Sequence, residues 1–387
     1  MLCAPVVIIP NIRVKANSSR EHERNFIGIA LIRGFPNFNH PSPTRETKSE
    51  SVSAFALAQM PSLSALKRTL RITLKSEVEI EYRSISRLAS VFGSSLPLPP
   101  ALDSDLDGAL RHILSNPGNL IRLKLVFRTA VAYGLSVDRA QDLAVALEYF
   151  HTASLVFDDL PCMDDASVRR GAPCVHRVYG QADAILAALA LINRAYALTW
   201  RSIAGCAVPI QLRALDFIEK CLGVHGLLNG QSRDLNFRDL PHTVETTERI
   251  AREKTVPLIR LTLVLPAMLG GASDRDLQQL ERISLFWGLG YQMVDDLKDM
   301  LQNAAQSGKT PARDALLEHP NVAVILGIRP AVRRLTRLID LGDRVLRHLV
   351  VCQPGLQFLG NLRDELQQEL ARVTRNCNVL AEEEVHS

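Results

Sequence analysis

The twenty residues DRAQDLAVALEYFHTASLVF (138–157) carry apolar side chains at three- and four-residue steps and contain neither glycine nor proline. This spacing predicts a long helix that is apolar on more than one face. The next fourteen residues, DDLPCMDDASVRRG (158–171), contain four aspartates and two adjacent arginines. A solvated surface rarely follows a buried helix so abruptly. The pair of segments therefore predicts a helix end that binds a metal cation and a polyanion.

The same helical periodicity continues through most of the chain beyond residue 64. It recurs in six further segments: 182–204, 211–228, 245–269, 277–301, 329–351 and 355–376. Alternating strand patterns with Asn-Gly or Asp-Gly turns are scarce, and Asn229-Gly230 lies inside a helical pattern. We therefore predict an all-α fold, a large single-domain helical bundle over residues 63–380.

Composition excludes several classes of protein. The net charge of +4 over 387 residues is too small to indicate nucleic-acid binding. The seven cysteines are scattered and form no CxxC pair, which argues against a disulfide scaffold and against a zinc site. The longest uninterrupted apolar run, AILAALALI (184–192), is far shorter than the ~20 residues that cross a bilayer. These features predict a cytoplasmic protein without a transmembrane segment.

Residues 1–62 differ from the rest in having no sustained period and clusters of Pro, Ser and Asn. We predict a disordered N-terminal extension. Its seven Lys and Arg against four Glu leave import into an organelle open, and a true start at Met60 is the alternative.

The first aspartate group lies where the helix must end. Pro161 disfavours continuation of the helix, so Asp158 and Asp159 occupy its last turn and Asp164 returns on the following turn. Carboxylates at a helix C-terminus repel one another and face the negative end of the helix dipole, unless a cation is bound. Oxygen ligands of this kind suit Mg²⁺. A solvated acidic loop is the alternative.

A second aspartate group closes another apolar helix, in GYQMVDDLKDM (290–300). Asp295 and Asp299 are four residues apart and share one helix face, while Asp296 points to the side. An amphipathic helix with an exposed end is the alternative. Two such groups facing each other could hold several Mg²⁺ ions, and several Mg²⁺ ions indicate a diphosphate ligand.

Basic residues suited to phosphate accompany these groups. Arg169 and Arg170 follow the first group, and Lys254 and Lys309 stand in REKT and SGKT. SGKT is not a phosphate-binding P-loop, because position 303 is Asn and no strand precedes it.

Taken together, these motifs resemble the trans-polyprenyl diphosphate synthases of the geranylgeranyl and farnesyl diphosphate synthase type, over residues 110–320 and more loosely to 375. The two aspartate motifs match, the first followed by RRG. Three more elements match: ExxHxxS (Glu148, His151, Ser154), GQxxDL (Gly230, Gln231, Asp234, Leu235) and the lysines Lys254 and Lys309.

The resemblance implies the isoprenoid synthase bundle with a central substrate cavity, a homodimer, and several Mg²⁺ ions, up to three. It implies that an allylic diphosphate ionises and then condenses with isopentenyl diphosphate. The implied catalytic residues are Asp158, Asp159, Lys254 and Asp295. The implied metal ligands are Asp158, Asp159, Asp164, Asp295, Asp296 and Asp299. The implied substrate-binding residues are Arg122, His151, Arg169, Arg170, Gln231, Lys254, Thr255, Gln292 and Lys309.

One element departs from the family pattern. Where GGKRxRP is expected, the chain has PGNLIRL (117–123), so Asn119 and Leu120 replace a lysine and an arginine that grip isopentenyl diphosphate. Arg122 is kept and Lys124 lies nearby. This leaves open a terpene cyclase, although the NSE-type second motif is absent, and a non-catalytic partner subunit, although both aspartate motifs are intact.

The resemblance also places the floor of the prenyl tunnel four and five residues before the first motif, at Ser154 and Ala153. Both side chains are small, which predicts a product longer than C15, most simply C20 geranylgeranyl diphosphate. Phe150 or the helix at 184–197 would then set the final stop. On this basis Ala153→Phe is expected to shorten the product.

Overall fold

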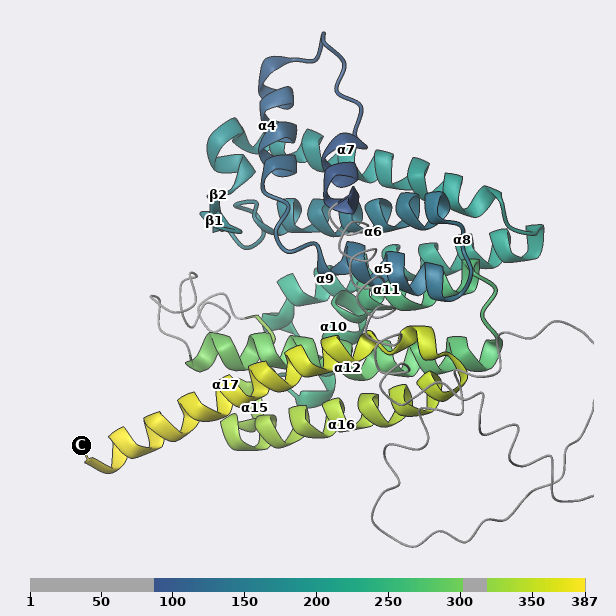
Figure 1. Cartoon of the computed structure of the whole chain (residues 1–387). Coiled ribbons are helices and arrows are strands. Elements are labelled where there is room, and N and C mark those ends of the chain that lie inside the picture. Colours follow the sequence, from purple (N-terminus) through teal and green to yellow (C-terminus); the bar gives the residue numbers. More distant parts are fainter. Residues whose placement is uncertain (1–86, 302–318, 387) are drawn as a thin grey trace, which may run out of the picture. The chain divides into compact units, whose positions relative to one another are not determined.

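The computed structural model describes residues 87–301 and 319–386, and all of them belong to one compact unit. The predicted extension at 1–62 and the predicted substrate ligand Lys309 lie outside the described residues. Within them the predicted all-α fold is confirmed (Figure 1).

Helices account for almost all of the regular structure. Residues 87–94 are helical, and the helices that follow are α4 (Ser104–Ser115), α5 (Ile121–Ala132), α6 (Val137–Asp158), α7 (Val175–Ala204), α8 (Val208–Leu222), α9 (Leu227–Leu235), α10 (Val244–Lys254), α11 (Val256–Leu269), α12 (Asp274–Leu301), α15 (Val322–Leu326), α16 (Ile328–Cys352) and α17 (Leu359–His386). Two 3₁₀ turns, η1 (Phe237–Asp239) and η2 (Pro354–Leu356), complete the helical elements. An antiparallel pair of two-residue strands, β1 (Val168–Arg169) and β2 (Ala172–Pro173), follows α6.

Local chemistry explains where several helices begin and end. Asp103 caps α4 by accepting from the backbone N–H of Asp105, and Thr243 caps α10 by accepting from that of Thr246. The segment 245–269, predicted as one helix, is two, because Pro257 in the first turn of α11 has no N–H to continue α10.

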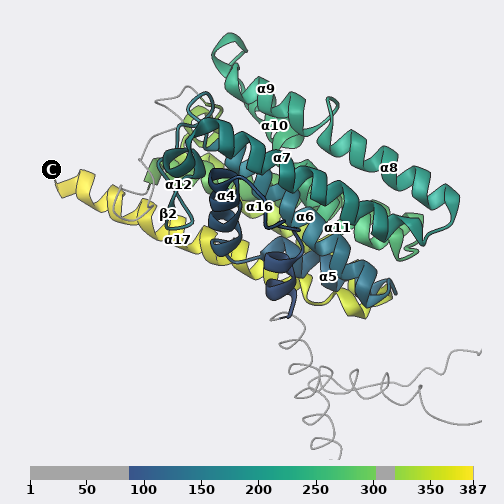
Figure 2. The ribbon, with the colours of Figure 1, turned by 90° about the horizontal axis from the view of Figure 1, so that it is seen from above.

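The two helices that carry the aspartate motifs lie inside the bundle. α6 packs against α5, α7 and α11, and α12 packs against α11, α16 and α17. The ribbon of α7 runs alongside α6 in both views (Figure 1, Figure 2). α6 buries side chains on most of its circumference, including Leu143, Leu147 and Tyr149, as its broad apolar pattern predicts. α11 contacts both motif helices and so fixes their spacing.

α7 is long and apolar enough to cross a membrane, judged by its 30-residue length and its composition alone. A core helix of a soluble protein passes the same test, and α7 packs along α6 and α4. The sequence prediction considered only the uninterrupted run at 184–192, which is shorter than the whole apolar window.

Candidate active site

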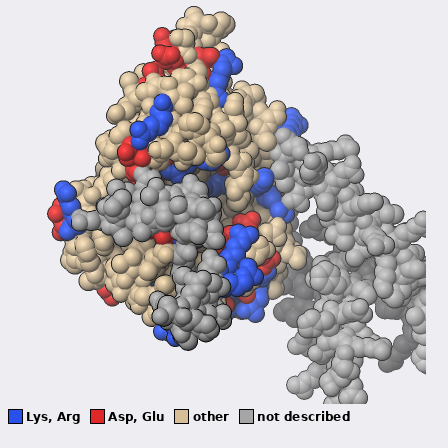
Figure 3. Space-filling view, turned by 90° about the vertical axis from the view of Figure 1, so that its left-hand side faces the viewer, with Lys and Arg blue, Asp and Glu red and all other residues tan. Residues whose placement is uncertain are grey.

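The first aspartate motif folds as its sequence predicts. α6 ends at Asp158, Asp159 is its C-cap, and the chain turns back so that the N–H of Asp164 donates to the carbonyl of Asp158 at 2.8 Å. The turn therefore returns Asp164 toward Asp158. In Figure 3, which faces the end of the unit where β1 and β2 lie, Lys and Arg side chains stand beside Asp and Glu side chains at several places on the face.

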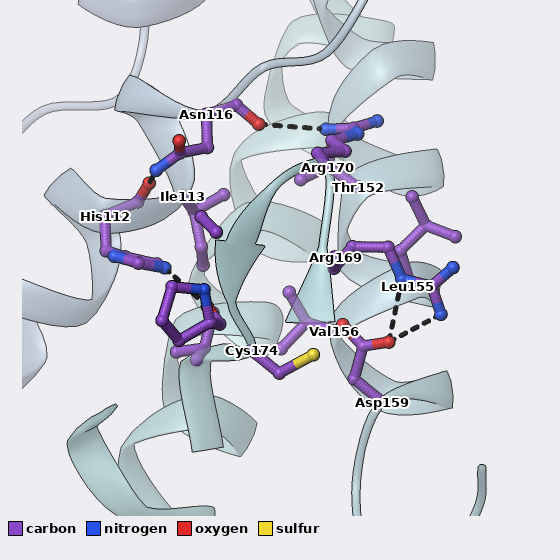
Figure 4. A pocket seen from close by; sticks show the side chains of 13 residues that line it. His112, Ile113, Asn116, Thr152, Leu155, Val156, Asp159, Arg169, Arg170 and Cys174 are labelled. Atoms are coloured by element: carbon purple, nitrogen blue, oxygen red, sulfur yellow. Dashed lines mark hydrogen bonds and ion pairs between the residues drawn. The ribbon is translucent and has the colours of Figure 1, made fainter. Parts of the chain in front are cut away.

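Asp159 is held by the hairpin that follows it. Nε and Nη2 of Arg169, at the end of β1, donate to Asp159 Oδ1 at 2.8 and 2.5 Å, and Asp159 is only 3% exposed. The two side chains meet beside a cavity of about 40 Å³ between α4, α6 and the hairpin (Figure 4). Burial, with Asp159 beside it, raises the pKa of the Cys174 thiol to about 12. Asp159 and Arg169 thus form a buried ion pair.

Asp158 faces a different set of charges. Burial raises its pKa to about 6, against the opposing charge of Lys254, while Asp164 and Asp234 raise it further. Lys254 Nζ is 2.5 Å from Asp234 Oδ2. Arg169 also opposes the shift of Asp158, so the carboxylates face two cations, and a bound metal ion would further relieve the repulsion between them.

In the second motif the three aspartates occupy unlike surroundings. Asp296 is fully buried: Val322 N–H donates to its Oδ2 at 2.8 Å, and Gln292 Nε2 donates to its Oδ1 at 3.0 Å. Asn321 Nδ2 donates to the Asp296 carbonyl at 3.1 Å. Asp295 is exposed and Asp299 is half-buried. Asp296 therefore joins α12 to the start of α15, whereas Asp295 is exposed to solvent.

Residues 254 and 255 bring the two motifs together. Lys254 lies among the charges around Asp158, and Thr255 Oγ1 donates to Gln292 Oε1 at 2.7 Å, one turn before Asp296. Gly230 permits this arrangement, because a Cβ there would collide with the backbone of Glu253 and Lys254. Lys254, whose charge acts on Asp158, is thus followed directly by a residue that contacts the helix of the second motif.

Basic side chains from α5 and from the β1–β2 hairpin gather around His151, which lies two turns before Asp158 on α6. Burial lowers the pKa of His151 well below its usual range, and Arg122, Arg170 and Arg169 lower it further. His151 is therefore neutral and surrounded by cations. His151 Nδ1 and Arg122 Nε are buried without a hydrogen-bond partner among the described residues, which suits a site for an anionic ligand.

Beneath these cations lies Glu148, a buried carboxylate to which the sequence assigned no role of its own. It accepts from the N–H of Leu123 at 3.0 Å and lies 3.8 Å from Arg170 Nη2. Burial raises its pKa, and Arg122 opposes that shift. Its position in ExxHxxS, three residues before His151, could have indicated this role, because residues three apart lie on the same face of a helix.

The acidic side chains have the right chemistry for Mg²⁺. Among residues 87–301 and 319–375, no three Asp, Glu, His or Cys side chains are grouped closely enough to hold a metal ion by themselves. Mg²⁺ commonly takes one or two carboxylates and completes its shell with water and substrate phosphate. The crowding around Asp158 fits this mode. Of the six predicted ligands, Asp159 and Asp296 are already engaged in buried protein contacts.

The two residues predicted to control product length differ in exposure. Ala153 is completely buried, whereas Ser154 keeps some exposed surface and its hydroxyl donates to the His151 carbonyl at 2.8 Å. Phe150 packs edge-to-face on Tyr196 of α7, with ring centroids 4.9 Å apart. Of the two predicted floor positions, Ser154 is therefore the more accessible.

Comparison with known proteins adds independent findings. The model of the polyprenyl synthetase family matches residues 103–344. A geranylgeranyl diphosphate synthase of Pantoea ananas is 34% identical over 67% of this chain and 84% of its own length. A farnesyl diphosphate synthase of Bacillus subtilis is 29% identical over 68% and 88%. A chloroplastic geranylgeranyl pyrophosphate synthase of Arabidopsis thaliana is 33% identical over 63% and 69%.

Solved structures agree with these relatives. The geranyltransferase of Helicobacter pylori, complexed with magnesium and isoprenyl diphosphate, superposes with a TM-score of 0.64 at 25% identity, over 77% of this chain and 97% of its own. An FPP/GFPP synthase of Zymomonas mobilis gives a TM-score of 0.62, also at 25% identity, over 77% and 99%.

Proposed function

The chain belongs to the polyprenyl synthetase family and is a prenyltransferase, and we propose that it uses Mg²⁺ to condense an allylic diphosphate with isopentenyl diphosphate, yielding geranylgeranyl diphosphate. The observation that carries the proposal is the pair of hydrogen bonds from Thr255 to Gln292 and from Gln292 to Asp296, next to Lys254, whose charge acts on Asp158. It supports a single diphosphate site between two groups of carboxylates.

In this mechanism the protein positions charge around a leaving group. Asp158, Asp164, Asp295 and Asp299 would hold Mg²⁺, which supplies positive charge to the allylic diphosphate. Lys254 adds a further cation, and the C–O bond breaks to leave an allylic carbocation and diphosphate. The double bond of isopentenyl diphosphate attacks the cation, and the departing diphosphate takes the proton that is lost. No side-chain nucleophile is needed.

His151 and Arg170 would face the second substrate. His151 is neutral and buried among arginines, so its ring can donate to a phosphate oxygen without adding charge to the site. Arg170 is held in place by Glu148 and by the carbonyl of Asn116, which accepts from its Nη1 at 3.4 Å. Both residues are thereby positioned before substrate arrives.

The small side chains at positions 153 and 154 support the proposed C20 product. We expect Ser154→Phe to shorten the main product by one isoprene unit. The phenyl ring would extend from the predicted floor into the tunnel and leave less room for the prenyl chain. Ala153→Phe is expected to shorten it too and to lower the melting temperature, since overpacking a filled core costs about 1–3 kcal/mol. Liquid chromatography of the dephosphorylated products measures both effects. Unchanged product length in both variants would refute this pocket assignment.

A homodimer is also part of the proposal. α7 and α8 expose an apolar stripe in which Leu186, Leu189, Tyr196 and Trp200 are each about half exposed and Leu212 is 64% exposed. Patches of this kind mark protein–protein contacts. Sedimentation of the purified chain will give the mass of the assembly.

The cytoplasm is the proposed location, with import into an organelle as the alternative. Several plant relatives are chloroplastic or mitochondrial. Microscopy of the full chain and of a chain lacking residues 1–62, each fused to a fluorescent protein, separates the two.

The decisive test of the activity is mass analysis of products after incubation with farnesyl diphosphate, isopentenyl diphosphate and Mg²⁺. A C20 diphosphate supports the proposal. A cyclic hydrocarbon formed without isopentenyl diphosphate would identify a terpene cyclase. No turnover by the well-folded chain would favour a non-catalytic subunit.

A further inference from the structure

The loop before α5 raises a specific problem for the second substrate. Position 119 is an exposed Asn, and Leu120 is 5% exposed with a left-handed backbone (φ 53°), so its side chain is turned into the core. Neither side chain carries a positive charge that could bind a diphosphate. In the proposed reaction, another residue would have to supply that charge.

Lys124, in the first turn of α5, lies close to position 119. Its ammonium folds back along the helix, and Nζ donates to the backbone carbonyl of Asn119 at 3.0 Å. The ammonium of Lys124 is therefore held next to position 119, where the family pattern has a lysine.

The surroundings of Lys124 connect it to the predicted site. Its charge is among those that lower the pKa of the buried Glu148, whose other cationic neighbours are Arg122 and Arg170. Burial raises the pKa of Glu365 on α17, and Lys124 is the cation that opposes this shift. Lys124 therefore shares the buried Glu148 with Arg122 and Arg170, the two arginines that also act on His151.

The loop backbone holds a second cation of this group in the same manner. Arg170 packs against Gly118 (φ 71°), where an added Cβ would lie 2.7 Å from Arg170 Nε. Asn116 and Asn119 accept through their carbonyls from Arg170 and Lys124 respectively. Backbone carbonyls of this loop thus hold both positive groups in place, beside the buried Glu148.

We propose that Lys124 replaces the missing cations at positions 119 and 120 and, with Arg122 and Arg170, binds the diphosphate of isopentenyl diphosphate. This inference rests on the proposed prenyltransferase function. It assigns a substrate-binding role to a residue outside the family motif and explains how the altered loop still serves the second substrate.

The test compares Lys124→Met with Lys220→Met in the full-length protein. Lys220 is an exposed lysine on α8 that pairs with Asp216 at 2.7 Å, away from the site. Losing one charged contact is expected to raise the KM for isopentenyl diphosphate about 10- to 100-fold in Lys124→Met. The KM for the allylic diphosphate should stay unchanged, and Lys220→Met should match the wild type. Calorimetric titration with isopentenyl diphosphate alone should show the same loss of affinity.

A rescue variant separates substrate binding from a structural role. Adding Asn119→Lys to Lys124→Met restores a cation at the original family position and should recover most of the lost affinity. Circular dichroism confirms that each variant is folded. An active wild type with an unchanged KM in Lys124→Met, or a loss that Asn119→Lys leaves unrepaired, would overturn the role of Lys124. A wild type that condenses nothing would overturn the proposed function, and this inference with it.

Discussion

Asp158→Asn is expected to lower kcat by about 10³-fold, because metal-borne stabilisation of a leaving group contributes several kcal/mol and each 1.36 kcal/mol changes a rate tenfold. The substitution keeps the shape of the side chain and removes the charge that faces Lys254 and Asp164. A Mg²⁺-dependent condensation assay with farnesyl and isopentenyl diphosphates measures the change.

We expect Asp158→Asn to lose activity without losing stability. Burial raises the pKa of Asp158 to about 6, so ionisation above that pH costs the folded state free energy. A neutral Asn avoids that cost. Without Mg²⁺ at pH 8, the melting temperature of Asp158→Asn should therefore equal or exceed that of the wild type.

Asp165→Asn is the matched control for this experiment. Asp165 belongs to the same aspartate-rich segment, but its side chain is 54% exposed and pairs with Arg177 at 2.7 Å. Exposed pairs of this kind contribute about 0–1 kcal/mol to stability, so the fold should be little changed. Because the Asp165 carboxylate pairs with Arg177 and is not a predicted metal ligand, kcat should stay close to that of the wild type. If both variants retain full activity, the first motif does not bind the catalytic metal.

The sequence predicts the helices of this chain well because their packing is recorded in the spacing of apolar residues. α6 is buried on most sides, and its apolar pattern is correspondingly broad. Pro161 places the end of α6, and with it the position of Asp158. The break between α10 and α11 was missed, since the apolar period runs on through Pro257.

Contacts between distant segments could not be read in the same way. Asp159 and Asp296 look like their neighbours in sequence, yet each lies in a buried contact that depends on how the chain folds back. Arg169 reaches Asp159 only through the β1–β2 hairpin, and Val322 lies 26 residues beyond Asp296. The spacing of apolar residues along a helix does not indicate such distant hydrogen-bond partners. The sequence therefore predicts the two acidic groups but does not show which of their aspartates are buried.

The burial of Asp296, unlike that of Asp295, predicts a second large effect, this time on stability. Asp296→Ala is expected to lower the free energy of unfolding by about 3 kcal/mol, because the buried N–H of Val322 and the amide of Gln292 lose their acceptor. Urea denaturation followed by circular dichroism measures the loss.

Asp295→Ala provides the contrast one residue earlier on the same helix. Asp295 is exposed, so its removal should lower the free energy of unfolding less than removal of the buried Asp296 does. It should nevertheless abolish most activity, since an outward-facing carboxylate can reach a metal ion. Equal and small losses of stability in the two variants would contradict the structural role of Asp296. In that case Asp296 would have to turn out of its contact with Val322 to bind metal, and raising the Mg²⁺ concentration should stabilise the wild type far more than Asp296→Ala.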